Sequence, residues 1–475
     1  MEIEECHPLV SFNEIKNWNP PSEAPPRKRT SLKKLETKSR TIVCHDMRGG
    51  YLEDRFVAGS TNHKSYAFWH WSMVDIFVYF SHKLLTIPPP GWIEAAHLHG
   101  VLILGTFITE WEGGTSICEE IFTKDEHIDL LANKMSLVAA HHNFDGYLIN
   151  IENKLSEVAL QGMIHFLKKL QTQLKMIKEE NLLIWYDSVT INGELLWQNE
   201  LNAKNYPFFE VSDGIFLNYT WKRENIEASV AAAGIRSFDV YVGIDIFGRG
   251  TYGGGGWETW QAVNVIRQHP LSVALFAPGW VYESFEEDYH NMQDKFWNFL
   301  RPHLHTNKRK LEFPIETSFC RGFGLYRRKF GKIVGSSFFN LSLQNLQAPS
   351  DEAHLRYHLE DSYHGGGSLK ILGGAVARIL DGHFCIERRS LFGLAYKVIS
   401  SSERLENNTI DEEEKSSFLE LGIFGGHDLR FTFKRSYSES GASRSNLIIP
   451  IDIDEDCVKP FCENITEPRN SSWKL

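Results

Sequence analysis

The 475-residue sequence lacks three features that would point to a membrane, a secreted scaffold or a nucleic-acid binder. No segment reaches the ~18–20 uninterrupted apolar residues of a membrane span, so we expect no membrane association. The 7 cysteines show neither metal-site spacing nor an even disulfide framework, which favours a reducing compartment. The formal net charge of −11 argues against nucleic acid or an anionic membrane as a partner.

The N-terminal region is polar and rich in proline. The acidic start, Met1–Glu5, lacks the apolar core of a secretory signal, so together with the cysteines it predicts a cytosolic protein. Prolines between 19 and 26 and the basic cluster Arg27–Arg29 predict a flexible arm over residues 1–40. The basic cluster reads either as a nuclear signal or patch for acidic partners, or as a solvated tail, which we favour.

Aromatic residues are plentiful, with 13 Trp, 16 Tyr and 31 Phe. Sugar C–H faces stack on aromatic rings, so this excess suits carbohydrate binding, although large hydrophobic cores use aromatics too.

Eight short, nearly continuous apolar runs follow the arm, and such runs are typical of parallel strands that are covered on both faces. They span residues 41–47, 74–80, 101–108, 144–152, 182–187, 214–221, 240–247 and 273–280. Helical periodicity lies between several of them, over 126–140, 155–178 and 257–267. Their spacing predicts an α/β fold with a (β/α)8 TIM barrel over residues 41–304.

The alternative fold is an open doubly wound sheet, which would need a glycine-rich phosphate turn after its first strand. The segment Asp46–Gly50 lacks the G-x-G-x-x-G spacing of that turn. The Gly253–Gly256 loop is not followed by Gly-Lys-Ser/Thr, so we read it as a rim loop rather than a phosphate cradle.

Beyond residue 305 the pattern changes to short alternating runs broken by Gly and Ser. These runs, at 331–334, 368–372, 428–433 and 447–451, predict an antiparallel β-sandwich module over 305–456. The acidic loop Asp411–Glu414 interrupts the module, and residues 457–475 read as a polar C-terminal tail.

A TIM barrel carries its chemistry at the C-terminal ends of its strands. The polar and aromatic residues at these ends are Asp46, His82, Glu110, Trp111, Asn150, Glu152, Tyr186, Asp187, Asn218, Trp221, Asp245 and Trp280. This set contains no Ser-His-Asp triad and no cysteine, and it is typical of a glycosidase rather than of an acyl-transfer or phosphate site.

The run 144–152 carries the most informative pair. Side chains alternate along a strand, so Asn150 and Glu152 share one face ~6–7 Å apart, with Leu148 below them. An amide beside a carboxyl suits substrate-assisted glycoside hydrolysis, in which the 2-acetamido group of the sugar attacks its own anomeric carbon. Glu152 would donate the proton and Asn150 would orient the acetamide. The alternatives are a helix-capping carboxylate and a turn-forming amide.

The same segment resembles a known motif. Asp145-Gly, Asn150 and Glu152 parallel the chitinase-type D-G-x-D-x-D-x-E strand, with Leu148 and Asn150 in place of two aspartates. Together with the segments 45–55, 185–187, 197–199, 218–221 and 243–250, this pattern strongly resembles glycoside hydrolase family 85, the endo-β-N-acetylglucosaminidases. The resemblance spans about 41–300 and continues less distinctly beyond.

The resemblance implies a retaining endoglycosidase that cuts the β1,4 bond of the di-N-acetylchitobiose core in N-glycans, glycopeptides and free oligosaccharides, with neither metal nor cofactor. It implies Glu152 as acid and then base, Asn150 as the acetamide-orienting group and Tyr186 beside the intermediate. The expected substrate-binding residues are Trp111, Trp197, Asn218, Trp221, Asp245 and Trp280. For the tyrosine and tryptophans the alternative is core packing, and for Asn218 and Asp245 it is hydrogen bonding within the rim.

Animal members of the family carry further β-structure, so the resemblance leaves open that the 305–456 module is truncated and the chain a short isoform. Two other functions then remain: a catalytically silent glycan-binding protein, and a chitinase, which the replaced aspartates disfavour.

Overall fold

The structure is a computed structural model that describes residues 4–21, 38–306, 309–310, 315–348, 355–371, 377–383, 389–396, 418–423, 429–434, 445–452 and 473–474. The chain forms two compact units. The first comprises Met1–Asn307, Cys320–Leu325 and Ser336–Leu346, and the second comprises the remaining residues from Lys308 onward. Among the residues described, no helix combines the length and the apolar character that crossing a bilayer requires.

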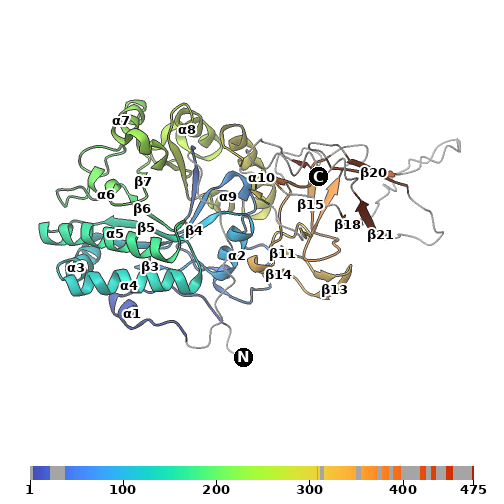
Figure 1. Ribbon diagram of the computed structural model, residues 1–475, viewed down its shortest axis with the longest axis horizontal. Coiled ribbons are helices and arrows are strands. Elements are labelled where there is room, and N and C mark those ends of the chain that lie inside the picture. Colours follow the sequence, from blue (N-terminus) through green and yellow to red (C-terminus); the bar gives the residue numbers. More distant parts are fainter. Residues whose placement is uncertain are drawn as a thin grey trace. The chain divides into compact units, whose positions relative to one another are not determined.

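The first unit is built on a closed barrel of eight parallel strands (Figure 1). Strand β1 pairs with both β2 and β9, and β2 pairs with β4, which completes the ring. All eight predicted strands are confirmed. They are β1 (Thr41–His45), β2 (Ile76–Tyr79), β4 (Leu102–Glu110), β5 (Gly146–Glu152), β6 (Leu182–Tyr186), β7 (Gly214–Leu217), β8 (Val240–Asp245) and β9 (Ser272–Phe276).

One further strand, β3 (Leu85–Thr86), adds antiparallel to β4. The sequence does not predict it because two residues are too few to show a period of two.

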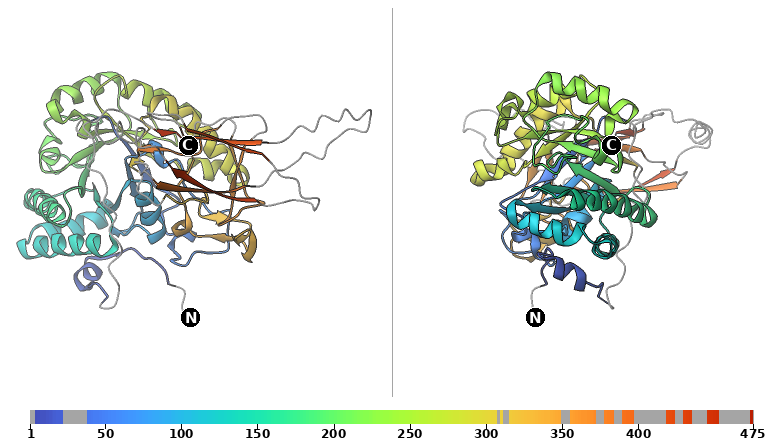
Figure 2. Two further views of the ribbon diagram at one scale, coloured as in Figure 1. Left: turned by 45° about the vertical axis from the view of Figure 1, so that its right-hand side comes forward. Right: turned by 90° about the vertical axis from the view of Figure 1, so that its left-hand side faces the viewer.

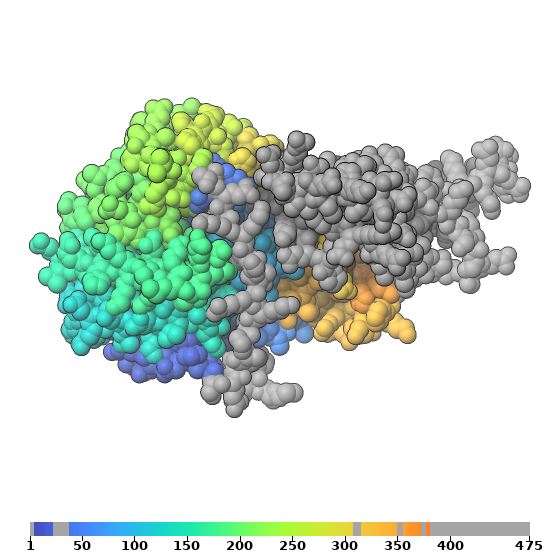
Figure 3. Space-filling model, in the orientation of Figure 1, coloured from blue at the N-terminus to red at the C-terminus, as the bar shows by residue number. Residues whose placement is uncertain are grey.

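Helices surround the strands, as both views of Figure 2 show. They are α2 (Pro90–Leu98), α3 (Trp111–Phe122), α4 (Asp125–His142), α5 (Glu157–Ile177), α6 (Tyr206–Glu210), α7 (Arg223–Ala233), α8 (Thr259–Ile266), α9 (Trp280–Ser284) and α10 (Tyr289–Leu300). The helices predicted over 126–140, 155–178 and 257–267 correspond to α4, α5 and α8. Helices α4 and α5 form the cyan and green surface at the left of Figure 3.

The interior of the barrel is filled by apolar side chains from all eight strands, so the barrel is a packed core rather than a pore. This cluster consists of Ile42, Cys44, Ile76, Val78, Phe80, Leu102, Leu104, Ile108, Leu148, Leu182, Ile184, Phe216, Tyr241 and Ala274. Tyr186 and Phe276 pack against it and are only partly buried. The alternation along β5 is therefore as predicted, with Leu148 inside.

Residues 4–21 differ from the predicted flexible arm. Helix α1 (Phe12–Asn17) buries Phe12 and Ile15, and the hydroxyl of Ser11 accepts a hydrogen bond from the N–H of Glu14. The N–H of Cys6 donates to the carbonyl oxygen of Arg55 over 2.8 Å. The prediction was wrong here because two apolar side chains and one N-cap are enough to dock a single helical turn. The basic cluster Arg27–Arg29 lies outside the described residues.

The predicted boundary at 304/305 is not a single cut. Strands β11 (Phe323–Gly324) and β14 (Phe338–Phe339) pair antiparallel inside the first unit, although the sequence pattern assigned both to the second. Phe323 and Phe339 are buried, so their apolar side chains belong to the core of the first unit.

The second unit contains the predicted β-structure. The runs at 331–334, 368–372, 428–433 and 447–451 correspond to strands β13 (Lys332–Gly335), β16 (Ser368–Ile371), β20 (Leu429–Lys434) and β21 (Ser445–Asp452). Each pairs antiparallel, with β12 (Arg327–Lys329), β15 (Leu355–His358), β19 (Phe418–Ile423) and β18 (Arg389–Tyr396) respectively. The sandwich arrangement and its truncation stay predictions.

Other parts of the second unit depart from the sequence pattern. Strand β10 (Arg309–Lys310) pairs parallel with β17 (Asp381–His383), which is not the antiparallel pairing expected of the module. The acidic loop Asp411–Glu414 lies outside the described residues. The predicted tail, 457–475, is described only at β22 (Trp473–Lys474), which pairs with β17.

A buried carboxylate secures the start of β5. Asp145 accepts hydrogen bonds from His97 Nε2 at 2.7 Å, from Lys178 Nζ at 2.9 Å and from the N–H of Ile103 at 2.9 Å. Burial alone would raise the pKa of Asp145, but the bond from His97 and the charges of His97 and Lys178 outweigh it and lower the pKa. The ionised form of Asp145 therefore stabilises the barrel.

We expect Asp145→Asn to lower the free energy of unfolding at pH 7 by about 3 kcal/mol, because it removes the buried carboxylate that accepts hydrogen bonds from His97 and Lys178. The lowered folded-state pKa makes this contribution complete above the ordinary aspartate pKa, near ~4, and lost as pH falls through the folded value. Urea unfolding at pH 7 and in acid measures both effects. Asp125→Asn, at an exposed carboxylate of α4, is the control, and equal stability of Asp145→Asn and the unchanged protein at pH 7 would contradict the assignment.

Candidate active site

Strand β5 delivers two polar side chains to the mouth of the barrel. Asn150 and Glu152 follow Leu148 on the inward face, whereas Tyr147, on the opposite face, donates a hydrogen bond to the carbonyl oxygen of Met135 in α4 at 2.8 Å. Asn150 is 5% exposed and Glu152 is half-buried. The amide and the carboxyl therefore stand side by side, as the sequence predicts.

Glu152 has the environment of a proton donor. Burial raises its pKa to about 6, and the nearby Glu110 carboxylate acts in the same direction. Hydrogen bonds from Asn150 and Trp197 and the charge of His82 act in the opposite direction and do not cancel the rise. Glu152 thus keeps its proton to a higher pH than a solvent-exposed glutamate does.

Asn150 has a free acceptor. The hydrogen bond between Asn150 and Glu152 lowers the pKa of Glu152, so it is donated to the carboxylate by the Nδ2 group of Asn150. Its Oδ1 atom is buried, and within the described part of the chain no group donates to it. A buried carbonyl oxygen without a donor costs free energy, and an amide N–H of a bound molecule would relieve that cost.

Tyr186 begins a chain of hydrogen bonds that links the ends of β6 and β7 to the loop that follows β6. Its hydroxyl donates to Oδ1 of Asn218 at 2.9 Å, and Nδ2 of Asn218 donates to Oδ1 of Asn199 at 2.7 Å. Burial, and then the charge of Glu152, raise the pKa of Tyr186 well above its ordinary value. Tyr186 is therefore a neutral phenol held next to Glu152.

Trp197 lies on the loop that follows β6. Asp187 anchors this loop by accepting hydrogen bonds from the N–H of Asn199 at 2.7 Å and from Nδ2 of Asn205 at 2.9 Å. Trp197 is 37% exposed, and its indole N–H donates to Glu152. One edge of the ring contacts the carboxyl and part of its surface remains open to solvent. The sequence placed Asp187 at a strand end but did not indicate that it anchors this loop.

The structure corrects two predicted substrate contacts. Trp221 is 3% exposed, donates its indole N–H to the carbonyl oxygen of Gly243 at 2.7 Å and stacks on Tyr252. Asp245 is fully buried and accepts from Nε of Arg249 at 2.8 Å and from Nη2 at 3.0 Å. The ring of Trp221 is covered by protein, and the carboxylate of Asp245 is occupied by Arg249. Neither side chain is therefore available to contact a sugar.

The two remaining tryptophans differ from each other. Trp111 follows Glu110 directly, adopts a φ of 57° and is 68% exposed, so its ring is free to stack on a ligand at the mouth. Trp280 is half-buried and packs edge-on against Trp257 and Phe285 at ring-centre distances of 5.4 and 5.6 Å. It belongs first to an aromatic cluster of the barrel.

Two strand-end residues acquire a role that the sequence did not assign. Nδ1 of His82 lies 3.1 and 3.2 Å from the two carboxylate oxygens of Glu110. Its other nitrogen, Nε2, lies 3.9 Å from the Asp46 carboxylate. Their positions after consecutive barrel strands were readable from the sequence, but the contact between them was not.

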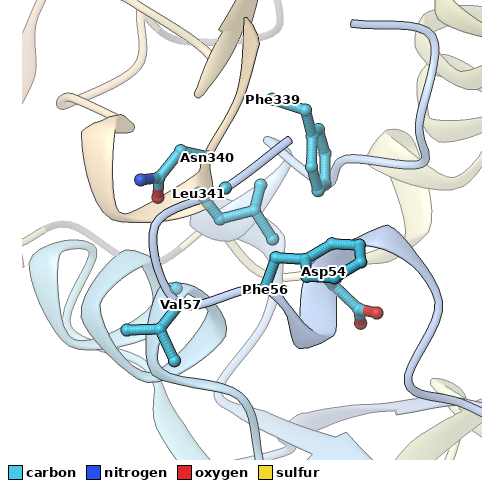
Figure 4. Close-up of a pocket in the computed structure, with 8 residues that line it drawn as sticks. Asp54, Phe56, Val57, Phe339, Asn340 and Leu341 are labelled. Carbon is cyan, nitrogen blue, oxygen red and sulfur yellow. The ribbon is translucent and has the colours of Figure 1, made fainter. Parts of the chain in front are cut away.

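A separate pocket lies elsewhere in the first unit (Figure 4). Its lining comprises Asp54, Phe56, Val57, Gly59, Gly91, Phe339, Asn340 and Leu341. Oδ2 of Asp54 already accepts hydrogen bonds from Tyr79 at 2.7 Å and Trp92 at 2.8 Å, so this carboxylate has a structural role. Over the described residues, no His, Cys, Asp and Glu side chains gather in threes or more as a metal ion would require.

Comparison with known proteins identifies the family. The model of glycosyl hydrolase family 85 matches residues 51–326, which include every barrel strand but the first. The chain belongs to this family. The predicted site residues Asn150, Glu152, Tyr186 and Trp197 all lie within the matched range.

Curated relatives extend the match beyond the barrel. The chain is 47% identical over 350 residues to a human protein named cytosolic endo-beta-N-acetylglucosaminidase, covering 71% of this chain and 47% of the relative. A Danio rerio protein of the same name is 42% identical over 424 residues, covering 85% and 58%. An Arabidopsis thaliana protein, cytosolic endo-beta-N-acetylglucosaminidase 2, is 44% identical and covers 66% and 45%. The chain thus spans about half the length of these relatives.

A solved structure supports the fold. The glycoside hydrolase domain of Endo-D from Streptococcus pneumoniae superposes with a TM-score of 0.69 at 19% identity, covering 94% of this chain and 77% of that one. At this identity the similarity establishes a common fold.

Proposed function

We propose that this family-85 chain is an endo-β-N-acetylglucosaminidase that hydrolyses the β1,4 bond of the di-N-acetylchitobiose core by substrate-assisted, retaining catalysis. The observation that carries the proposal is the pairing of Asn150 with Glu152, which leaves one buried amide acceptor open beside one raised-pKa carboxyl. An acetamido sugar supplies both an N–H for that acceptor and a glycosidic oxygen for the proton.

The reaction follows from these two groups. The acetamido oxygen attacks the anomeric carbon and the C–O bond to the second GlcNAc breaks, while the carboxyl of Glu152 gives its proton to the departing oxygen. Oδ1 of Asn150 accepts the acetamide N–H and stabilises the positive charge of the oxazolinium ion. Water then attacks the anomeric carbon, the bond between that carbon and the acetamido oxygen breaks to restore the acetamide, and Glu152, now a carboxylate, takes the proton from the water. The two displacements retain the anomeric configuration.

The other groups support this geometry. The neutral hydroxyl of Tyr186, held by Asn218, lies beside Glu152, where the ring of the intermediate would form. The exposed faces of Trp111 and Trp197 offer stacking surfaces for a sugar. We place the enzyme in the cytosol, acting on N-glycans, glycopeptides and free oligosaccharides, in keeping with the names of its relatives.

Incubation with a high-mannose glycopeptide tests the function. We expect a mass loss that leaves a single GlcNAc on the peptide and releases a glycan with the other GlcNAc at its reducing end. Binding without any mass loss would instead favour the glycan-binding alternative. Cleavage of chitin oligomers in place of the glycopeptide would favour a chitinase.

We expect Trp111→Ala to raise the KM for the glycopeptide by roughly 10-fold with a smaller change in kcat, because it removes an exposed stacking ring worth about 1.4 kcal/mol. Steady-state kinetics separates the two constants. Met176→Ala removes another exposed apolar side chain, at the far end of α5, and should leave KM unchanged. An unaltered KM in Trp111→Ala would show that this ring does not contact the substrate.

A further inference from the structure

Glu110 is the direct neighbour of Glu152 on the adjoining strand. Strands β4 and β5 are parallel, and their register pairs Ile108 with Asn150 and Glu110 with Glu152. Paired residues on parallel strands point to the same face, and the backbones of adjoining strands lie about 4.8 Å apart. Two carboxyl groups therefore enter the mouth together, and two carboxylates that close cannot both ionise freely.

His82 contacts the carboxyl group of Glu110. The imidazole follows β2, which pairs with β4, and its Nδ1 lies within 3.2 Å of both oxygens of Glu110. The hydrogen bond to Glu110 raises the pKa of His82, and the charges of Glu110, Asp46 and Glu152 add to that rise. His82 thus lies between the carboxyl groups of Glu110 and Asp46, and its positive charge opposes the effect of Glu110 on Glu152.

We propose that Glu110 and His82 are positioning residues that act in opposite directions on Glu152 and so set the pH range over which Glu152 holds its proton. The proposal rests on the function proposed above. Neither residue is assigned a contact with the substrate. The opposing effects of Glu110 and His82 together determine the pH at which Glu152 loses its proton.

The remaining groups around Glu152 are neutral at neutral pH or act through this pair. Tyr186 and Tyr219 interact with the charge of Glu152, and both have raised pKa values, first because of burial. Asn150 and Trp197 donate hydrogen bonds and carry no charge. Asp46 interacts with His82 and with Arg249. Arg249 is itself bound to Asp245. The charged groups that act directly on Glu152 are thus Glu110 and His82.

The two charges give predictions of opposite sign. In Glu110→Gln the neighbouring anion is gone, so Glu152 should lose its proton at lower pH, and the alkaline limb of kcat/KM should move down by roughly one pH unit. In His82→Gln the cation is gone, so the same limb should move up. Glu112→Gln, at an exposed carboxylate two residues beyond Glu110, is the control and should leave the limb in place.

A second readout needs no turnover. Because the folded-state pKa of Glu152 is raised, ionisation of Glu152 lowers the stability of the folded protein. The Tm of the unchanged protein, measured relative to that of Glu152→Gln, should therefore decrease as the pH rises from the ordinary glutamate pKa, near ~4.3, to about 6. When the same two proteins also carry Glu110→Gln, the pH interval over which the Tm difference decreases should be narrower, and the decrease should be smaller. In the His82→Gln background the interval should widen.

The outcomes are distinct. The proposal is supported if Glu110→Gln and His82→Gln shift the alkaline limb of kcat/KM, or the pH interval of the Tm difference, in opposite directions. The proposal is overturned if both variants shift these readouts in the same direction or leave them unchanged. Loss of turnover at every pH in Glu110→Gln with an unchanged melting difference would overturn it in favour of direct chemistry by Glu110. Failure of the unchanged protein to cleave the glycopeptide would refute the proposed function, while the melting comparison would still decide the pair.

Discussion

Glu152→Gln is expected to lose at least about 100-fold in hydrolysis of a glycopeptide, since a positioned general acid and base contributes roughly 10²–10⁴-fold. Glutamine keeps the shape of the side chain and one acceptor oxygen but can neither give a proton to the departing oxygen nor take one from water. The fold should survive. Above about pH 6 the variant should be at least as stable as the unchanged protein, because it removes a carboxylate whose ionisation burial opposes.

The measurement is the rate of glycan release at several pH values, together with thermal unfolding of the same samples. Glu112→Gln provides the control, since Glu112 is exposed on α3 only a few residues from the site. Normal turnover in Glu152→Gln, with the unfolding temperature maintained, would refute the proposed role of Glu152 and the mechanism with it.

Asn150→Ala is expected to reduce hydrolysis of the natural glycan by at least about 100-fold, the size of effect seen when a group that stabilises a developing charge is removed. Alanine has no acceptor for the acetamide N–H, so the acetamido oxygen is no longer directed at the anomeric carbon. A donor supplied as a preformed oxazoline has already completed that attack. The variant should therefore use the oxazoline far better, relative to native glycan, than the unchanged protein does.

The quantity to compare is the ratio of the rates with oxazoline and with native glycan. Asn181→Ala removes a buried amide that bonds the carbonyl oxygen of Leu174 at 2.9 Å, away from the mouth, and should lower stability without altering this ratio. An Asn150→Ala variant that handles both donors with equal loss would show that Asn150 does not orient the acetamide.

Much of the barrel was readable from local pattern. All eight parallel strands were predicted, because strands covered on both faces must be apolar almost throughout. The shared face of Asn150 and Glu152 followed from the period of two along β5. Their roles in catalysis remain proposals, but their adjacency needed no knowledge of any other part of the chain.

Contacts between distant segments were not readable in this way. The burial of Trp221 under Tyr252 and the capture of Arg249 by Asp245 depend on how two rim loops fold back on the barrel. The return of β11 and β14 to the first unit and the docking of α1 are further cases. In each case a side chain that the sequence leaves unassigned to any partner is buried or bound by residues tens or hundreds of positions away, or by residues of its own loop.

The sequence by itself determined the strand ends at which polar groups gather, because alternation and strand length are local properties of the backbone. Only the tertiary structure decided which of those groups are exposed to solvent, which are buried by packing, and which contact one another, as His82 and Glu110 do. The physical reason is that exposure, pKa and hydrogen-bond geometry depend on neighbours in space. Those neighbours are set by the closure of the barrel and the packing of its loops.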